Sequence, residues 1–274
     1  MPAPQELDPA ESPRALLGSE IRKYRMASDM SQEQLAEKIN FSAGMVSFVE
    51  RATRIPSRQF VELCEKALGL NGELLRLWPL VSMTARPEWF QPWLEIEPDA
   101  TVIRTWQPNV VPGLLQTEAY ARAILSGRPR MADDQIEEAV VARLDRQLIL
   151  DRVTPPMLWA VLDEGVLSRP IGGRDVMREQ LEHLIKMSDN RSVTIQVSPM
   201  DSRATIGLEG GFMIAGRPGQ PDTVYMEAAT LGFVTIEAEK VAKVINLYDA
   251  LRAEAFPARA SIELIKEKLV NLWT

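Results

Sequence analysis

Along residues 14–84, apolar side chains recur at every third or fourth position, the pattern of helices that bury one face. The one proline before Pro79 in this segment is Pro56, so little interrupts helix formation. The pattern predicts five helices, at about residues 14–28, 31–39, 42–50, 57–69 and 71–84. Residues 1–13 are rich in proline and acidic side chains and are predicted to form a disordered leader.

A different pattern follows a junction at residues 86–93, RPEWFQPW, whose three aromatic side chains are expected to pack in a core. Short apolar runs bounded by Pro, Gly and Asp predict strands at about residues 100–106, 157–162, 193–197, 211–215 and 223–227. Helices are predicted at about residues 117–125, 133–150, 174–187, 237–254 and 261–272. This interleaving indicates a second domain over residues 85–274 with an α+β fold, or alternatively an α/β fold.

The composition is that of an ordinary globular protein, with 46% hydrophobic and 25% charged residues in a chain of 274. The first residues, MPAPQE, lack the basic and apolar regions of a secretion signal. The sequence has no apolar run of about 18 residues, the length that a membrane span requires. We therefore expect a cytoplasmic protein that does not associate with a membrane.

Few residues of the chain are suited to catalysis or to metal binding. With one cysteine, Cys64, and one histidine, His183, an internal disulfide is excluded and a His/Cys metal site lacks ligands. The apolar neighbours of Cys64 predict that it is buried, which disfavours a Cys–His nucleophile pair. The adjacent Asp163 and Glu164 are expected to diverge, and the glycine-rich residues 207–211 lack the lysine of a phosphate loop. We therefore expect neither enzyme activity nor a cofactor or metal.

Charge is distributed unevenly along the chain, whose formal net charge is −7. Residues 14–58 carry eight positive and five negative side chains, a net charge of +3, whereas residues 1–13 carry −3. The remainder of the chain therefore holds −7. A mildly basic segment precedes an acidic body, a distribution that is compatible with nucleic-acid binding at the N-terminus but does not establish it.

The most informative segment is residues 31–50, SQEQLAEKINFSAGMVSFVE. Ser31 and Gln34 match a capping box that begins one helix, and Ser42 is suited to cap the next. Asn40 lies between the helices, where the turn requires the positive φ that asparagine tolerates. These features predict two helices that meet at a steep angle, either a helix-turn-helix or an ordinary helical hairpin.

The side chains of these two helices divide into an inward and an outward set. Small Ala36 allows the second helix to cross closely, and the predicted core positions are Leu35, Ile39, Val46 and Val49. The outward positions of the second helix are Ala43, Gly44, Ser47 and Phe48.

Residues 14–70 resemble the phage Cro/repressor type of helix-turn-helix, the XRE family. The resemblance implies that the helix at 42–50 enters the major groove of double-stranded DNA, with contacts from Ser42, Ala43, Gly44, Ser47 and Phe48. It also implies that Gln32 braces the phosphate backbone, and that Arg25 and Glu50 form a pair that joins the first helix to the recognition helix.

The sequence departs from that family where bases are usually contacted. Asn40 replaces the commoner glycine of the turn, and Ala43 and Gly44 stand where polar side chains often contact bases. The bidentate contacts that distinguish bases are therefore missing at these two positions. Specificity is expected to depend on DNA shape and on Ser42, Ser47, Arg51, Arg54 and the contact of Phe48 with thymine methyl groups.

The rest of the chain resembles the C-terminal domain of WhiJ-type, antitoxin-like regulators of actinobacteria. The segments that carry this resemblance are residues 111–122 (VPGLLQTEAYAR), 143–147 (RLDRQ), 163–169 (DEGVLSR) and 176–184 (VMREQLEHL). The resemblance implies transcriptional control and a small antagonist protein encoded nearby. It leaves the biochemical role of the domain open.

Two functions of the large domain remain open from the sequence. In the first, the domain dimerises and binds a protein partner, which an exposed apolar groove would support. In the second, it senses a small molecule, or acts as an enzyme, which a deep pocket lined by Arg143, Arg146 and Arg169 would support.

A homodimer is expected because one helix-turn-helix covers few base pairs. The candidate dimer surface is the apolar face of the helix at 237–254, formed by Val241, Val244, Ile245, Tyr248 and Leu251. The alternative is that this face packs within its own domain.

Overall fold

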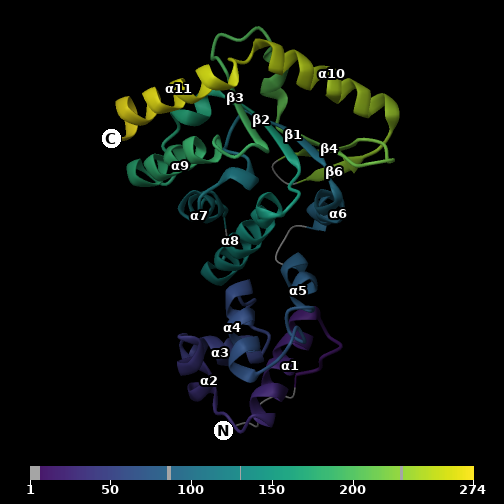
Figure 1. Cartoon of the computed structure of the whole chain (residues 1–274), viewed down its shortest axis with the longest axis vertical. Coiled ribbons are helices and arrows are strands. Elements are labelled where there is room, and N and C mark those ends of the chain that lie inside the picture. The colour runs from purple at the N-terminus through teal and green to yellow at the C-terminus, as the bar shows by residue number, and fades with distance from the viewer. Residues whose placement is uncertain (1–6, 85–87, 130, 229–230) are drawn as a thin grey trace. The chain divides into compact units, whose positions relative to one another are not determined.

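The N-terminal helices form where the sequence supplies both an apolar stripe and a capping side chain. The computed structural model describes residues 7–84, 88–129, 131–228 and 231–274. Its first helices are α1 (Pro13–Ala27), α2 (Gln32–Ile39), α3 (Ala43–Glu50), α4 (Arg58–Leu68) and α5 (Trp78–Thr84) (Figure 1). Each of α1 to α4 follows a serine whose hydroxyl accepts a backbone N–H of the first turn, namely Ser12, Ser31, Ser42 and Ser57. The predicted helical N-terminal region is confirmed.

The fifth helix is shorter than the predicted helix at 71–84, because α5 begins only at Trp78. Pro79 has no backbone N–H, which is tolerated in the first turn of a helix but not in its interior. The preceding residues form turns instead. Glu65 holds these turns, since its buried carboxylate accepts three of their backbone N–H groups.

The chain forms two compact units whose division does not follow sequence order. Unit 1 comprises the described parts of residues 1–87 and 130–145, and unit 2 those of residues 88–129 and 146–274. Most of α8 (Asp133–Gln147) therefore belongs to unit 1, although the sequence places it inside the second domain, at 85–274.

Specific contacts join α8 to the rest of unit 1. The carboxylate of Glu138 accepts the backbone N–H of Ile55 at 2.7 Å, and the indole N–H of Trp78 donates to Asp145 at 3.1 Å. Val141 packs against the unit 1 core. An amphipathic pattern predicts such a helix but does not show against which domain it packs, so the sequence misses this arrangement.

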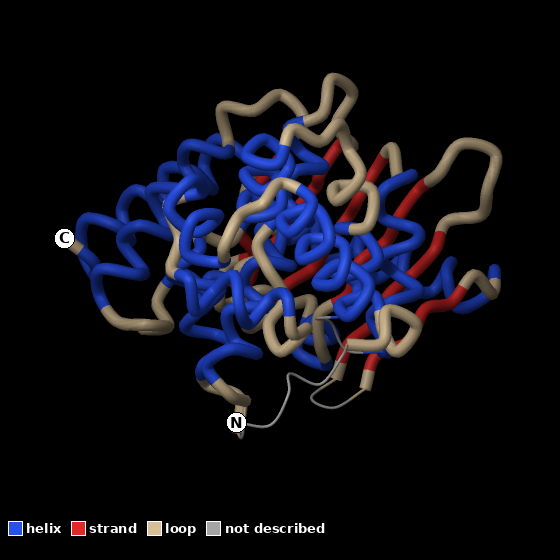
Figure 2. Tube along the Cα trace, turned by 90° about the horizontal axis from the view of Figure 1, so that it is seen from below, coloured by secondary structure: helices blue, strands red, loops and turns tan. Residues whose placement is uncertain are grey.

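Unit 2 is built on a mixed sheet of six strands among the described residues, in the order β3-β2-β1-β4-β5-β6. The strands are β1 (Val102–Gln107), β2 (Met157–Asp163), β3 (Val193–Ser198), β4 (Phe212–Gly216), β5 (Thr223–Glu227) and β6 (Gly232–Thr235). The first three are parallel, and β4, β5 and β6 each run antiparallel to the preceding neighbour in the sheet. Figure 2 shows them in red, side by side. The predicted α+β class is confirmed.

Helices cover both faces of this sheet, and they are α6 (Gln91–Ile96), α7 (Glu118–Ser126), α9 (Arg174–Met187), α10 (Ala238–Glu254) and α11 (Ala258–Lys268). Ile103, Leu158 and Ile195 line the face that packs with α7, α9 and α11. Trp106 and Val161 line the opposite face, which packs with α10 (Figure 1). The sequence did not predict α6 or β6, which are short and lie near prolines or a glycine.

The apolar face of α10 is buried within unit 2. Val241, Val244, Tyr248 and Leu251 pack against the sheet, and the Tyr248 hydroxyl donates to the carbonyl of Trp159 at 3.1 Å. This face is therefore not available as a dimer surface, and the alternative, packing within its own domain, is correct.

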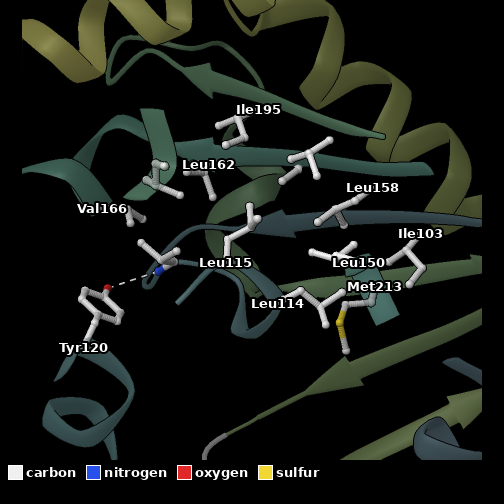
Figure 3. Close-up of a cluster of buried hydrophobic side chains, with 14 of the residues drawn as sticks. Ile103, Leu114, Leu115, Tyr120, Leu150, Leu158, Leu162, Val166, Ile195 and Met213 are labelled. Carbon is white, nitrogen blue, oxygen red and sulfur yellow. Dashed lines mark hydrogen bonds between the residues drawn. The ribbon is translucent and has the colours of Figure 1, made fainter. Parts of the chain in front are cut away.

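The segment 111–122 forms part of the buried structure of unit 2. Leu114 and Leu115 enter the core beneath the sheet, and the Tyr120 hydroxyl accepts the N–H of Val111 at 3.2 Å (Figure 3). The buried amide of Gln180 bridges the same segment, accepting the N–H of Thr117 and donating to the carbonyl of Leu115. These contacts give the segment 111–122 a structural role in the core of unit 2.

Candidate DNA-binding interface

The turn between α2 and α3 sets the direction of α3. Asn40 adopts φ 58° and ψ 44°, the left-handed conformation that its sequence position predicts. The chain then reverses as the N–H of Phe41 donates to the carbonyl of Ala36 at 2.9 Å. The ring of Phe41 packs edge-on against Phe60 of α4, with ring centroids 5.1 Å apart. Buried Ala36 lies in the same core, so a backbone hydrogen bond and side-chain packing both fix the turn.

Glu50, the last residue of α3, joins three helices. Its carboxylate accepts two hydrogen bonds from Arg25 of α1, from Nε at 2.5 Å and from Nη2 at 2.8 Å. The Nε2 atom of Gln32, the first residue of α2, donates to Glu50 Oε2 at 2.7 Å. The Glu50 side chain is only 2% exposed. Its hydrogen bonds raise the pKa of Arg25 above the ordinary value of an arginine. Removing one partner would leave a buried charge uncompensated.

Gln32 thus has a structural contact at the position where the sequence predicts a phosphate contact. Its amide nitrogen carries two hydrogens, of which Glu50 accepts one. The half-buried side chain is held at the start of α2 by this bond. The second amide hydrogen of Gln32 can therefore donate to another acceptor, such as a phosphate oxygen.

The residues assigned to the outward face of α3 differ in exposure. Ser42 and Gly44 are exposed, and Phe48 is 45% exposed, whereas Ser47 is half-buried. Ala43 is also half-buried and packs against the unit 1 core, so it presents less surface than its predicted position implies. The Ser42 hydroxyl accepts the N–H of Met45 as the helix cap, and it can still donate its own hydrogen.

Two arginines follow the recognition helix. Arg51 is exposed, its Nε donates to the carbonyl of Ser47 at 3.2 Å, and its guanidinium lies 5.4 Å from the centre of the Phe48 ring. Arg54 is half-buried in the loop that follows. Both positive charges thus follow the C-terminal end of α3 within four residues.

Sequence reasoning missed a residue that sets how closely α1 approaches α3. Gly18 of α1 is buried directly against the end of α3, and a glycine in the middle of a predicted helix is a signal that could have found it. Sequence reasoning also missed Glu138, which binds the backbone N–H of Ile55 in the loop after α3, because a single carboxylate on an amphipathic helix carries no comparable signal.

The one cysteine and the one histidine of the chain are both removed from solvent, fully or in part. Burial raises the pKa of the Cys64 thiol to about 12, so it remains protonated and is a poor nucleophile. Burial lowers the pKa of half-buried His183. Within the described ranges, no group of three or more His, Cys, Asp and Glu residues could hold a metal ion. None of the helices described there is long and apolar enough to cross a membrane.

The three arginines named above as possible pocket residues differ in their surroundings. Arg146 is largely buried and forms a 2.5 Å ion pair with buried Glu97, and its guanidinium lies 5.0 Å from the centre of the Phe90 ring. Arg169 is exposed, and Arg143 belongs to unit 1.

Comparison with known proteins matches two parts of the chain. Residues 21–75 match the helix-turn-helix family HTH_3, and residues 90–267 match a domain of unknown function, DUF5753. The control protein C.BamHI of Bacillus amyloliquefaciens is 39% identical over 59 residues, which make up 21% of this chain and 73% of that protein. No solved structure matches the chain.

Proposed function

The chain belongs to the DUF5753 family and is a DNA-binding transcriptional regulator with an N-terminal helix-turn-helix; from this we propose that it binds operator DNA as a homodimer and is controlled by a small antagonist protein, in the manner of antitoxin-like regulators. Its DNA contacts come from α3 and from the residues that flank it. The large domain supplies the assembly and partner contacts.

The observation that carries the DNA-binding proposal is the way α3 is presented. Its inner side is fixed by Glu50 to α1 and α2, while Ser42, Gly44 and Phe48 remain exposed. A helix held rigidly with one exposed face is what insertion into the major groove requires. The residues that we propose to face the bases are Ser42, Ala43, Gly44, Ser47 and Phe48.

Phosphate contacts are proposed for Gln32, Arg51 and Arg54. The two arginines carry charge near the end of α3, and Gln32 has an amide hydrogen beyond the one that Glu50 accepts. Phosphate contacts release counterions, so affinity should fall steeply with salt. Replacing Arg51 and Arg54 with alanine should weaken binding to random duplex and at least equally to specific duplex, and should flatten the salt dependence measured by fluorescence anisotropy. Unchanged affinity for both duplexes would refute this role.

The homodimer is supported by the sparse polar surface of the recognition face, where Gly44 and half-buried Ala43 offer no base-specific hydrogen bonds. Two copies related by a two-fold axis would contact half-sites about 34–36 Å apart. Sedimentation of the full chain, with and without a selected palindromic duplex, tests this proposal. A monomer in both conditions, bound once per duplex, would refute it.

A protein partner is supported by the exposed apolar side chains beside edge strand β6. Leu231, Phe233 and Ile236 are each more than half exposed, and large exposed apolar residues that cluster often mark a protein contact. Titration calorimetry of the full chain with the product of a neighbouring short reading frame tests the proposal. Binding that Phe233→Glu abolishes, and that the exposed Val153→Glu leaves intact, would support it; absence of binding to that product would contradict it.

A further inference from the structure

Phe48 is a large apolar side chain on the exposed face of the recognition helix. Its side chain remains 45% exposed, although the unit 1 core lies directly behind α3. One helical turn earlier lies Gly44, which has no side chain to cover the ring. An ideal Cβ on Gly44 would lie 4.0 Å from Cε2 of Phe48, so the edge of the ring rests over the bare backbone of that turn.

Arg51 holds the ring from another direction. Its guanidinium lies over the Phe48 ring, 5.4 Å from the centroid, and its Nε is bonded to the carbonyl of Ser47. Cation–π contact of this kind orients an exposed ring as well as stabilising it. The ring is therefore supported by Gly44 and Arg51 and keeps a free apolar surface.

We propose that Phe48, supported by Gly44 and Arg51, selects DNA by binding the 5-methyl group of a pyrimidine in the major groove. This inference rests on the proposed function, since it assumes that α3 enters that groove. The 5-methyl of thymine is the apolar group that the major-groove edges of the four bases offer. Phe48 has no hydrogen-bonding group, so apolar contact is its means of distinguishing base pairs.

The same chemistry predicts a second ligand. Cytosine methylated at C5 presents a methyl group at the same place as thymine does, although its exocyclic amine replaces the thymine carbonyl. A site read through Phe48 therefore distinguishes methylated from unmethylated cytosine, and thymine from uracil.

The experiment begins with selection of high-affinity duplexes from a random library by the full chain. Each thymine of the selected site is then replaced, one at a time, by deoxyuridine, and affinity is measured by fluorescence anisotropy. At the position that Phe48 contacts, loss of the methyl should weaken binding about fourfold, corresponding to about 0.8 kcal/mol for one buried carbon. At the same position, 5-methylcytosine should bind about fourfold more tightly than cytosine.

The matched variant is Phe48→Ala, which removes an exposed ring and leaves the core residues of unit 1 in place. It should reduce both ratios, thymine over uracil and methylcytosine over cytosine, to about one. Met26→Ala is the control, because Met26 is 58% exposed on α1 and lies outside the recognition helix. Its ratios should match those of the unmodified chain.

The outcomes separate this inference from the proposed function. If no duplex is enriched and none binds, both fail. If a duplex binds specifically but every thymine tolerates uracil, the regulator stands and the methyl contact is wrong. Methyl ratios that persist in Phe48→Ala would assign the contact to another residue and would also overturn the inference.

Discussion

Gly18 of α1 lies so close to the carbonyl oxygen of Val49 in α3 that a Cβ at position 18 would overlap that oxygen. The same Cβ would lie 3.3 Å from the carbonyl carbon and oxygen of Glu50. Because the obstacle is backbone, neither helix can accommodate a methyl group by changing a rotamer. The close approach of α1 to α3 therefore depends on glycine at this position.

Gly18→Ala should lower the free energy of unfolding of unit 1 by about 1–3 kcal/mol, the usual cost of overpacking. It should also weaken DNA binding, because α3 must shift away from α1. Thermal unfolding and anisotropy measure the two effects. Gly44→Ala is the matched control for stability, because a Cβ at position 44 meets only ordinary contacts. Equal stability of the two variants would contradict the steric argument.

Glu50→Ala should destabilise unit 1 by about 3–5 kcal/mol, because it leaves the buried guanidinium of Arg25 without its carboxylate. Chemical denaturation gives the value. The control is Glu62→Ala, whose ion pair with Arg58 is about half exposed and should be worth about 1 kcal/mol or less. A Glu50 variant as stable as the Glu62 variant would show that the pair is unimportant.

Glu138→Ala should destabilise unit 1 by about 1–3 kcal/mol, since the buried N–H of Ile55 would lose its acceptor. Glu138→Gln retains an acceptor oxygen and should cost less. The comparison tests whether α8, whose Glu138 lies 83 residues after Ile55, is part of the helix-turn-helix unit. Unfolding of unit 1 that is insensitive to both substitutions would refute this role of α8.

His183 should make unit 2 less stable in mild acid. Burial lowers its pKa in the folded state, so the unfolded chain binds the proton more readily. The free energy of unfolding should therefore fall as the pH drops below the unfolded value, about 6.5, towards the lower folded value. Urea denaturation between pH 5 and 8 should show this component in the unmodified chain and lack it in His183→Gln. Parallel pH profiles for the two proteins would rule it out.

Cys64 should report the opening of unit 1. With a pKa of about 12 and no exposed surface, its thiol should react with a disulfide reagent at pH 8 only when the core opens. Gly18→Ala and Glu50→Ala should accelerate the reaction in proportion to their loss of stability. Rapid labelling of the unmodified chain would mean that the core around α4 is open in solution.

The local sequence was sufficient to predict features that depend on neighbouring residues. Serine caps, apolar spacing and the left-handed Asn40 specify α2 and α3 through interactions that span only a few positions. Apolar runs likewise predict most of the strands of unit 2. Composition alone excludes an internal disulfide, since there is one cysteine.

The tertiary structure decided which apolar faces meet and which polar groups pair across long stretches of chain. An apolar stripe on α10 specifies burial but not the surface that buries it, which is the sheet of its own unit. The same ambiguity hid the packing of α8 in unit 1, where Glu138 meets Ile55. Gln32 had a predicted phosphate role, yet only the fold brings Glu50 within 2.7 Å of its amide. Each of these relationships depends on three-dimensional proximity, which hydrophobic periodicity does not encode.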